Sequence, residues 1–226
     1  QFDISNAFIK ADEKVIVRLP PRWSKDGRKG DLVRLLRSLY GLRISPRKWF
    51  DTFRSYLEGD GWTMCDREPG LFRKGEITLS VYVDDGLMSG PNQADLVAER
   101  DRICRNLGGK VIQPIMEGVV EVRDILGATL RYDRSKAWMK LCMSDAIDRV
   151  LAKFNMSDVR SVVSPVVPGN DVAEGAENVS FPIRNLVGSL QYIACICRCD
   201  ISYAVQRIAR CVTRCTDNVV KAAKRI

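Results

Sequence analysis

Histidine is absent from the 226 residues of the chain. Its absence excludes Ser-His-Asp and Cys-His catalysis and metal sites built on histidine, so any chemistry must use carboxylates, lysine or cysteine. Long apolar runs are also lacking: stretches such as Leu190 to Cys197 reach about eight residues, whereas a transmembrane helix needs about 18 or more. We therefore expect no membrane partner.

Cysteine is sparse for a chain of this length, with eight residues, and three of them form the cluster Cys195, Cys197 and Cys199. The cluster lacks the Cys-x-x-Cys spacing of zinc sites, and its role stays open. We expect buried, reduced thiols, as in a cytosolic or nuclear protein.

Basic residues outnumber acidic ones by 36 to 28, which gives a formal net charge of +8 and an isoelectric point near 9.2. Arg43, Arg47 and Lys48 lie next to Trp49 and Phe50, a pattern that suits a polyanionic partner such as nucleic acid. A solvated basic face is the alternative, and the charge balance alone does not decide between the two.

Strand patterns dominate the first part of the chain and helical patterns the last, which predicts an α+β fold. The apolar run Ile77–Val83 predicts a strand, and Val119–Met143 predicts a hairpin around a polar turn at Asp133–Lys136. Two helices are expected near the end, over Pro182–Cys195 and Asp200–Cys215.

An earlier helix is expected to begin at Ser45-Pro46, with the serine as its cap and the proline at its first position. Trp49 and Phe53 follow at helical spacing, and the helix should end near Gly59. We interpret the two aromatic residues as core residues of this helix rather than as platforms on which bases stack.

Two adjacent acids, Asp84 and Asp85, interrupt the apolar strand pattern. In one interpretation, Asp85-Gly86 makes a hairpin turn and Asp84 is solvated. In the other, a rigid strand presents the acids to metal ions, which need several converging carboxylates. Adjacent strand residues point to opposite faces, so the two acids can act together only if the turn is distorted or a third acid comes from elsewhere, and Asp3 at the end of the first strand is the natural third.

The segments Gln1–Phe8 and Tyr82–Asp85 resemble motifs A and C of reverse transcriptases. Further blocks, in order along essentially the whole chain, are similar to those of copia-type LTR retrotransposons: Leu39–Trp49, Ile125–Gly127, Lys153–Met156, Val187–Tyr192 and Asp200–Val205. The resemblance implies an RNA-directed DNA polymerase of the right-hand type that adds dNTPs to a primer. It divides the chain into residues 1–118 as a palm with incomplete fingers, 119–163 as a primer-grip hairpin with a thumb-like helix, 164–180 as a linker, and 181–226 as a helical connection region without RNase H.

The resemblance also implies roles for individual residues. Asp3 and Asp84 would bind two Mg²⁺ ions, or Mn²⁺, with Asp85 as the weaker participant and the carbonyl of Ile4 assisting. Phe8 would be the steric gate that rejects a ribose 2′-OH, although a plain core aromatic is the alternative. The remaining positions implied to contact nucleotide or nucleic acid are Tyr40, Gly41, Arg43, Arg47, Lys48, Tyr82, Leu126 and Gly127.

The implied partners are an RNA or DNA template-primer, dNTPs, and the integrase and RNase H segments of a parent Pol polyprotein that acts in cytoplasmic virus-like particles or in the nucleus. The chain begins without Met, directly at motif A, so we expect it to be a piece of a longer protein. It departs from the family at Cys197-Arg198-Cys199-Asp200, where Thr-Arg-Pro-Asp is usual. A decayed or domesticated palm that binds nucleic acid without catalysis, and an unrelated metal-dependent phosphohydrolase, are the alternatives.

Overall fold

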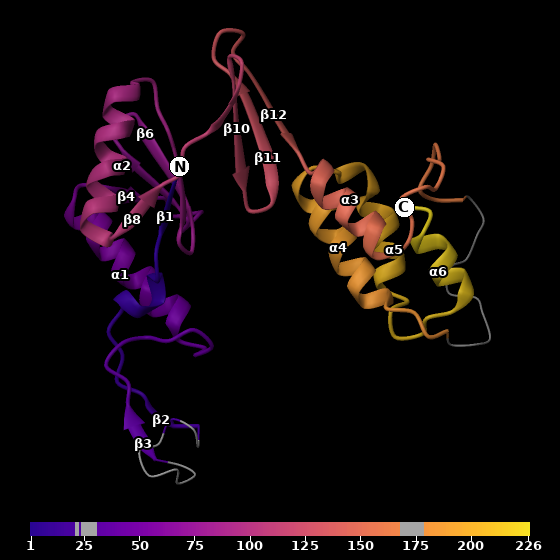
Figure 1. The fold of residues 1–226 in the computed structure, drawn as a ribbon, viewed down its shortest axis with the longest axis horizontal. Helices are drawn as coiled ribbons and strands as arrows, with labels where there is room; N and C mark the ends of the chain where they lie inside the picture. The colour runs from indigo at the N-terminus through magenta and orange to yellow at the C-terminus, as the bar shows by residue number, and fades with distance from the viewer. Residues whose placement is uncertain (21–22, 24–30, 168–178) are drawn as a thin grey trace. The chain divides into compact units, whose positions relative to one another are not determined.

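A computed structural model describes residues 1–20, 23, 31–167 and 179–226 of the chain. The chain divides into two compact units, Gln1–Gln113 and Pro114–Ile226, which we call the first and second unit (Figure 1). Antiparallel sheets occur together with helices, which confirms the predicted α+β class. The finer division into palm, thumb and connection stays a prediction, and most of the predicted linker 164–180 lies outside the described residues.

A six-stranded antiparallel sheet, in the order β4-β5-β6-β7-β1-β8, forms the centre of the first unit. Its strands are β1 (Phe2–Ile4), β4 (Thr63–Met64), β5 (Leu71–Lys74), β6 (Ile77–Tyr82), β7 (Asp85–Ser89) and β8 (Gly109–Val111). The first strand in the sequence therefore lies between two later ones. Residues that begin the chain are thereby brought beside residues more than 80 positions later.

Helices α1 (Ser45–Gly59) and α2 (Gln93–Leu107) cover the sheet and share one core with it (Figure 1). Phe2 and Ile4 of β1 are buried in this core, whereas Asp3 between them is only partly buried. Because side chains alternate across a strand, Asp3 points to the other face of the sheet. The expected core positions Trp49 and Phe53 are each 1% exposed, which confirms their assignment.

The helix ends follow local signals in part. Asn92 caps α2 by accepting a hydrogen bond from the backbone N–H of Ala94 at 2.9 Å, and Gly108 ends it with φ of +63°. α1 begins at Ser45, as predicted, but the serine does not cap it. Its hydroxyl donates instead to the carbonyl of Leu39 at 2.7 Å and is buried there.

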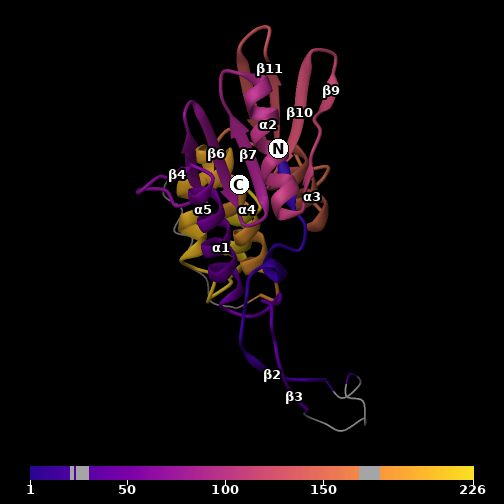
Figure 2. The same cartoon turned by 90° about the vertical axis from the view of Figure 1, so that its left-hand side faces the viewer.

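A separate hairpin, β2 (Ile16–Arg18) and β3 (Leu32–Arg34), points away from the six-stranded sheet (Figures 1 and 2). It follows the short 3-10 helix η1 (Ala7–Lys10). An isolated bridge between Asp12 and Arg37 supports its base, where the two side chains also form an ion pair.

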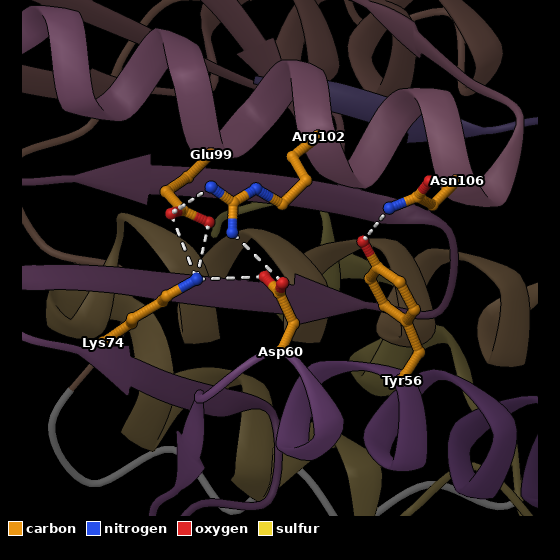
Figure 3. A network of polar contacts seen from close by, with 6 residues as sticks. All are labelled: Tyr56, Asp60, Lys74, Glu99, Arg102 and Asn106. Atoms are coloured by element: carbon orange, nitrogen blue, oxygen red, sulfur yellow. Dashed lines mark hydrogen bonds and ion pairs between the residues drawn. The ribbon is translucent and has the colours of Figure 1, made fainter.

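An ion-pair network joins β5, α2 and the end of α1 (Figure 3). Lys74 Nζ lies 3.0 Å from Asp60 Oδ2 and 3.1 Å from Glu99 Oε1, and an Arg102 nitrogen lies 3.2 Å from Asp60 Oδ1. Partial burial raises the pKa of Asp60, but the hydrogen bonds from Lys74 and Arg102 outweigh it and hold the pKa below its ordinary value. The network was not foreseen from the sequence, because its members come from three separate elements.

Lys74→Met is expected to lower the free energy of unfolding of the first unit by about 1–2 kcal/mol at pH 7, between the values for exposed and for buried pairs. Because the pKa of Asp60 is lowered in the fold, this contribution is present above the ordinary pKa and is lost as the pH falls below about 4. Urea unfolding followed by tryptophan fluorescence measures it.

The control is Arg54→Met, which breaks the exposed Arg54–Glu58 pair on α1 and should cost at most about 0.5 kcal/mol. Equal losses in the two variants, or a loss for Lys74→Met that does not shrink in acid, would contradict a stabilising role for the network.

The second unit contains a four-stranded antiparallel sheet in the order β12-β11-β10-β9. Its strands are β9 (Ile115–Glu117), β10 (Val120–Ile125), β11 (Ala128–Asp133) and β12 (Trp138–Cys142). The predicted hairpin around the polar turn is confirmed by the pairing of β11 with β12. Its predicted extent over 119–143 is wrong, because a second tight turn at Leu126-Gly127 makes three strands of this segment.

Helices α3 (Ser144–Lys153), α4 (Ile183–Ile196), α5 (Ser202–Ala209) and α6 (Asp217–Ala223) complete the second unit (Figure 1), with the 3-10 helix η3 (Cys199–Ile201) before α5. The helix expected over 200–215 ends at Ala209, and Thr216 begins another by accepting from the N–H of Val219. Phe154 and Val219 belong to the apolar core that joins these helices.

All eight cysteines are free, and only Cys104 and Cys215 are buried. Cys195 and Cys199 are exposed, so the expectation of buried thiols is wrong for these two. No helix in the described part of the chain has both the length and the apolar character to cross a membrane.

Candidate active site

The turn between β6 and β7 consists of Val83 and Asp84, because Tyr82 pairs with Asp85 and Val81 with Gly86. The interpretation of Asp85-Gly86 as the turn is therefore wrong, since both residues belong to β7. Val83 has φ of +56°, and Asp84 is not among the residues with positive φ. This combination is typical of a type II′ hairpin turn, whose first central position normally uses glycine.

Asp3 lies directly opposite Asp85 in the pairing of β1 with β7. Directly opposite residues of an antiparallel pair have their side chains on the same face of the sheet. The backbone N–H of Ile4 donates to the carbonyl of Asp84 at 2.9 Å, which ties the turn to the strand of Asp3. The structure thus brings Asp3 and Asp85 together and places Asp84 in the adjoining turn.

The close approach of β7 to β1 depends on Gly86. A Cβ at this position would lie 2.1 Å from Cζ of the Phe2 ring, which is fully buried. The glycine therefore makes room for an aromatic side chain beneath the acids. Its role is to allow packing, not to make a turn.

Trp49 contacts the acid-bearing turn from α1. Its Nε1–H donates a hydrogen bond to the carbonyl of Val83 at 2.6 Å. Sequence reasoning identified Trp49 as a core residue but missed this contact. The available signal was general: a buried indole N–H usually needs an acceptor.

The donor set suits a hard divalent cation, because carboxylate oxygens are the ligands that Mg²⁺ and Mn²⁺ prefer. Asp3 and Asp85 supply such oxygens on one face of a rigid sheet, and Asp84 supplies the third carboxylate one residue away. Within the described ranges, no group of three or more His, Cys, Asp or Glu side chains is already gathered to hold a metal. The residues therefore fit a divalent cation by chemistry and by the placement of one opposed pair.

Two residues predicted to contact the nucleotide lie against each other. The ring centroids of Phe8 and Tyr40 are 4.7 Å apart, and the rings are tilted by 53°. Phe8 is partly buried, and Tyr40 is 54% exposed. Gly41 follows with φ of +97° and no atom near its Cβ position, so glycine serves there for its left-handed backbone rather than for a close approach.

The predicted nucleic-acid contacts of the first unit are accessible. Arg43, Arg47 and Lys48 are exposed at the start of α1 and just before it, and Arg47 forms an exposed ion pair with Asp51 at 3.0 Å. Tyr82, beside the acidic turn, is 62% exposed. Such a surface suits phosphate contacts, which need cations that solvent and ligands can reach.

Leu126 and Gly127, predicted to grip the primer, form the two-residue turn between β10 and β11 in the second unit. Their φ values of +53° and +77° are those of a type I′ hairpin turn. The N–H of Gly127 donates to Asp124 Oδ1 at 3.1 Å, and the hydroxyl of Tyr192 on α4 donates to the carbonyl of Leu126. Sequence reasoning did not single out Tyr192.

The protein has two opposed carboxylates beside a tight turn of an antiparallel sheet, and helices pack on the other face of that sheet. These features indicate a protein with a candidate cation-dependent centre. The family described as reverse transcriptase (RNA-dependent DNA polymerase) matches residues 1–168. The chain belongs to this family. The predicted resemblance to copia-type retrotransposon enzymes is thereby confirmed.

Three relatives illustrate the similarity. The chain is 26% identical over 226 residues to the Retrovirus-related Pol polyprotein from transposon TNT 1-94 of Nicotiana tabacum, covering 93% of the chain and 16% of the relative. It is 31% identical over 235 residues to the Transposon Ty1-DR1 Gag-Pol polyprotein of Saccharomyces cerevisiae, covering 93% and 12%. It is 29% identical over 235 residues to the Retrovirus-related Pol polyprotein from transposon RE1 of Arabidopsis thaliana, covering 100% and 15%.

The chain thus spans between 12% and 16% of the length of these three polyproteins. No solved structure matches the chain.

Proposed function

We propose that the chain contains the nucleotidyl-transfer centre of a copia-type RNA-directed DNA polymerase, with Asp3, Asp84 and Asp85 as its acids. The observation that best supports the proposal is the register that sets Asp3 opposite Asp85 beside the Val83-Asp84 turn. This register brings the acids of two separate family motifs together on one face of a rigid sheet.

The chain's own groups would act by placement and charge. Asp3, Asp84 and Asp85 would hold two Mg²⁺ ions, or Mn²⁺, which when bound lower the pKa of a primer 3′-hydroxyl and neutralise the triphosphate. The β1–β7 pairing keeps two of the acids from separating, and the Ile4–Asp84 hydrogen bond keeps the third beside them. Phe8 and Tyr40 would border the sugar and base of the incoming dNTP.

Template-primer contacts are proposed for residues of each unit separately. Arg43, Arg47 and Lys48 would bind template phosphates, so the affinity should fall as salt rises. The Leu126-Gly127 turn would contact the primer end. The relatives named as Pol polyproteins support the proposal that the chain works as part of a longer Pol polyprotein. Integrase and RNase H segments beside it, and a place in cytoplasmic virus-like particles or in the nucleus, belong to the same proposal.

Primer extension by this chain on an RNA template tests the proposal. We expect dNTP incorporation that requires Mg²⁺ or Mn²⁺ and stops when the cation is chelated. Binding of the template-primer is measured in parallel by fluorescence anisotropy. Binding without extension would contradict the proposal and favour a palm that binds nucleic acid without catalysis.

Phe8→Val is expected to raise the ratio of ribonucleotide to deoxynucleotide incorporation about 10- to 100-fold, because the smaller side chain leaves room for a 2′-OH. Single-nucleotide extension with each substrate measures the ratio. Phe50→Val is the matched control, since Phe50 is also a partly buried aromatic packed on the same core. An unchanged ratio in Phe8→Val, or the same change in both variants, would identify Phe8 as a plain core residue.

A further inference from the structure

The turn that holds Asp84 begins with a residue in an unfavourable conformation. Val83 has φ of +56°, in the left-handed region where the branched Cβ of valine crowds its own backbone. Glycine would adopt this φ without that crowding. A turn of this kind persists only where its surroundings hold it.

Both carbonyls of the turn are hydrogen-bonded to elements that lie outside the hairpin. The carbonyl of Asp84 accepts from the N–H of Ile4 on β1, and the carbonyl of Val83 accepts from Nε1 of Trp49 on α1. Val83 itself is 38% exposed, so packing encloses its side chain only in part. The hydrogen bond from Trp49 is therefore the contact that restrains Val83, the residue with the unfavourable φ.

The Trp49 side chain is well suited to hold the turn in place. It is 1% exposed and packs against Phe53 of the same helix, with ring centroids 5.5 Å apart. The indole can therefore change direction little, and its N–H reaches Val83 across 34 residues of sequence at 2.6 Å. A rigid donor on a helix is thereby joined to the turn that contains Asp84.

We propose that Trp49 is a positioning residue, whose indole N–H holds the strained Val83-Asp84 turn in the conformation that keeps Asp84 beside Asp3 and Asp85. The role in catalysis rests on the function proposed for these acids. The hold on the turn is a property of the fold and can be measured without any reaction. Trp49 does not touch substrate in this proposal, and it acts through the carbonyl of Val83.

Three variants test the role of Trp49. Trp49→Phe keeps an aromatic ring but removes the donor. Trp62→Phe is the matched control, because Trp62 is 2% exposed in the same core and its Nε1 has no hydrogen-bond partner among the described residues. Trp49→Phe combined with Val83→Gly removes both the donor and the crowding that makes the donor necessary.

The first measurement is hydrogen exchange at the backbone N–H of Ile4, which donates to Asp84. We expect exchange about tenfold faster in Trp49→Phe than in Trp62→Phe, the size of effect that one lost hydrogen bond produces. Equal exchange in the two single variants would overturn the proposal, whether or not the wild type extends a primer.

The second measurement is steady-state primer extension. In Trp49→Phe, kcat should fall about 10- to 100-fold, because acids displaced by a fraction of an ångström lose much of their effect, while KM for dNTP changes by less than about threefold. The double variant Trp49→Phe with Val83→Gly should have a kcat about tenfold higher than Trp49→Phe alone, because glycine adopts the positive φ without the hydrogen bond from Trp49. Trp62→Phe should leave kcat within about threefold of wild type.

Equal loss of kcat in Trp49→Phe and Trp62→Phe, or no recovery with Val83→Gly, would overturn the positioning role. A wild type that does not extend a primer, together with faster Ile4 exchange only in Trp49→Phe, would contradict the proposed function yet support the hold of Trp49 on the turn. The two proposals can thus fail separately.

Discussion

Asp3→Asn is expected to lower kcat for nucleotide incorporation at least about 1000-fold, a loss of about 4 kcal/mol of transition-state stabilisation. Asparagine has nearly the shape of aspartate but lacks the negative charge that a divalent cation requires. The same substitution removes one of two like charges set opposite each other on β1 and β7, an arrangement that costs stability. Activity should therefore fall while thermal stability stays equal or rises.

Single-turnover primer extension and thermal unfolding measure the two effects of Asp3→Asn. Millimolar Mg²⁺ should raise the melting temperature of the wild type but not of the variant, because a cation that binds the folded state stabilises it. Asp66→Asn is the control, since Asp66 is an exposed acid of the same unit, and its kcat should stay within about twofold of wild type. Asp3→Asn that retains more than about a tenth of wild-type kcat would exclude Asp3 from the centre.

Gly86→Ala is expected to destabilise the first unit by about 3 kcal/mol, the upper part of the range for an overpacked core. The new Cβ would lie 2.1 Å from the ring of Phe2, which is fully buried and so has no room to withdraw. Separation of β7 from β1 would also move Asp85 away from Asp3. Urea unfolding followed by tryptophan fluorescence measures the loss.

A second substitution identifies the cause. Phe2→Leu removes ring atoms next to Gly86, so the double variant should be more stable than the sum of the two single losses predicts. Gly188→Ala in α4 is the control, because no atom lies within 4 Å of its Cβ position, and alanine there should stabilise the helix by about 0.5–1 kcal/mol. Additive losses for Gly86→Ala and Phe2→Leu would contradict the steric explanation.

The sequence by itself determined the elements with strong local signals. Helix α2 has Asn92 at its start and Gly108 at its end, and a capping side chain and a left-handed glycine act within a few residues. Ordered motifs likewise identified the family, which the match over residues 1–168 confirms. They led to Asp3, Asp84 and Asp85 and to the pair Phe8 and Tyr40, although the role of each residue is still a proposal.

Local signals failed where distant residues compete with them. Asp85-Gly86 is a common hairpin-turn sequence, but Gly86 lies in β7 against the ring of Phe2, and the chain turns at Val83-Asp84. Likewise, serine is a residue type that often caps helices, but the hydroxyl of Ser45 donates to the carbonyl of Leu39 instead. In each case a neighbour outside the local element decided the role of the residue.

Tertiary structure alone decided what surrounds the acids of motif C. The register of β1 against β7 sets Asp3 opposite Asp85, and the packing of α1 places the indole of Trp49 against Val83. The physical reason is that a strained valine turn is stable only with partners supplied by other elements, and a single sequence does not state which elements meet. The sequence determined which acids are present, and the fold decided how they are held.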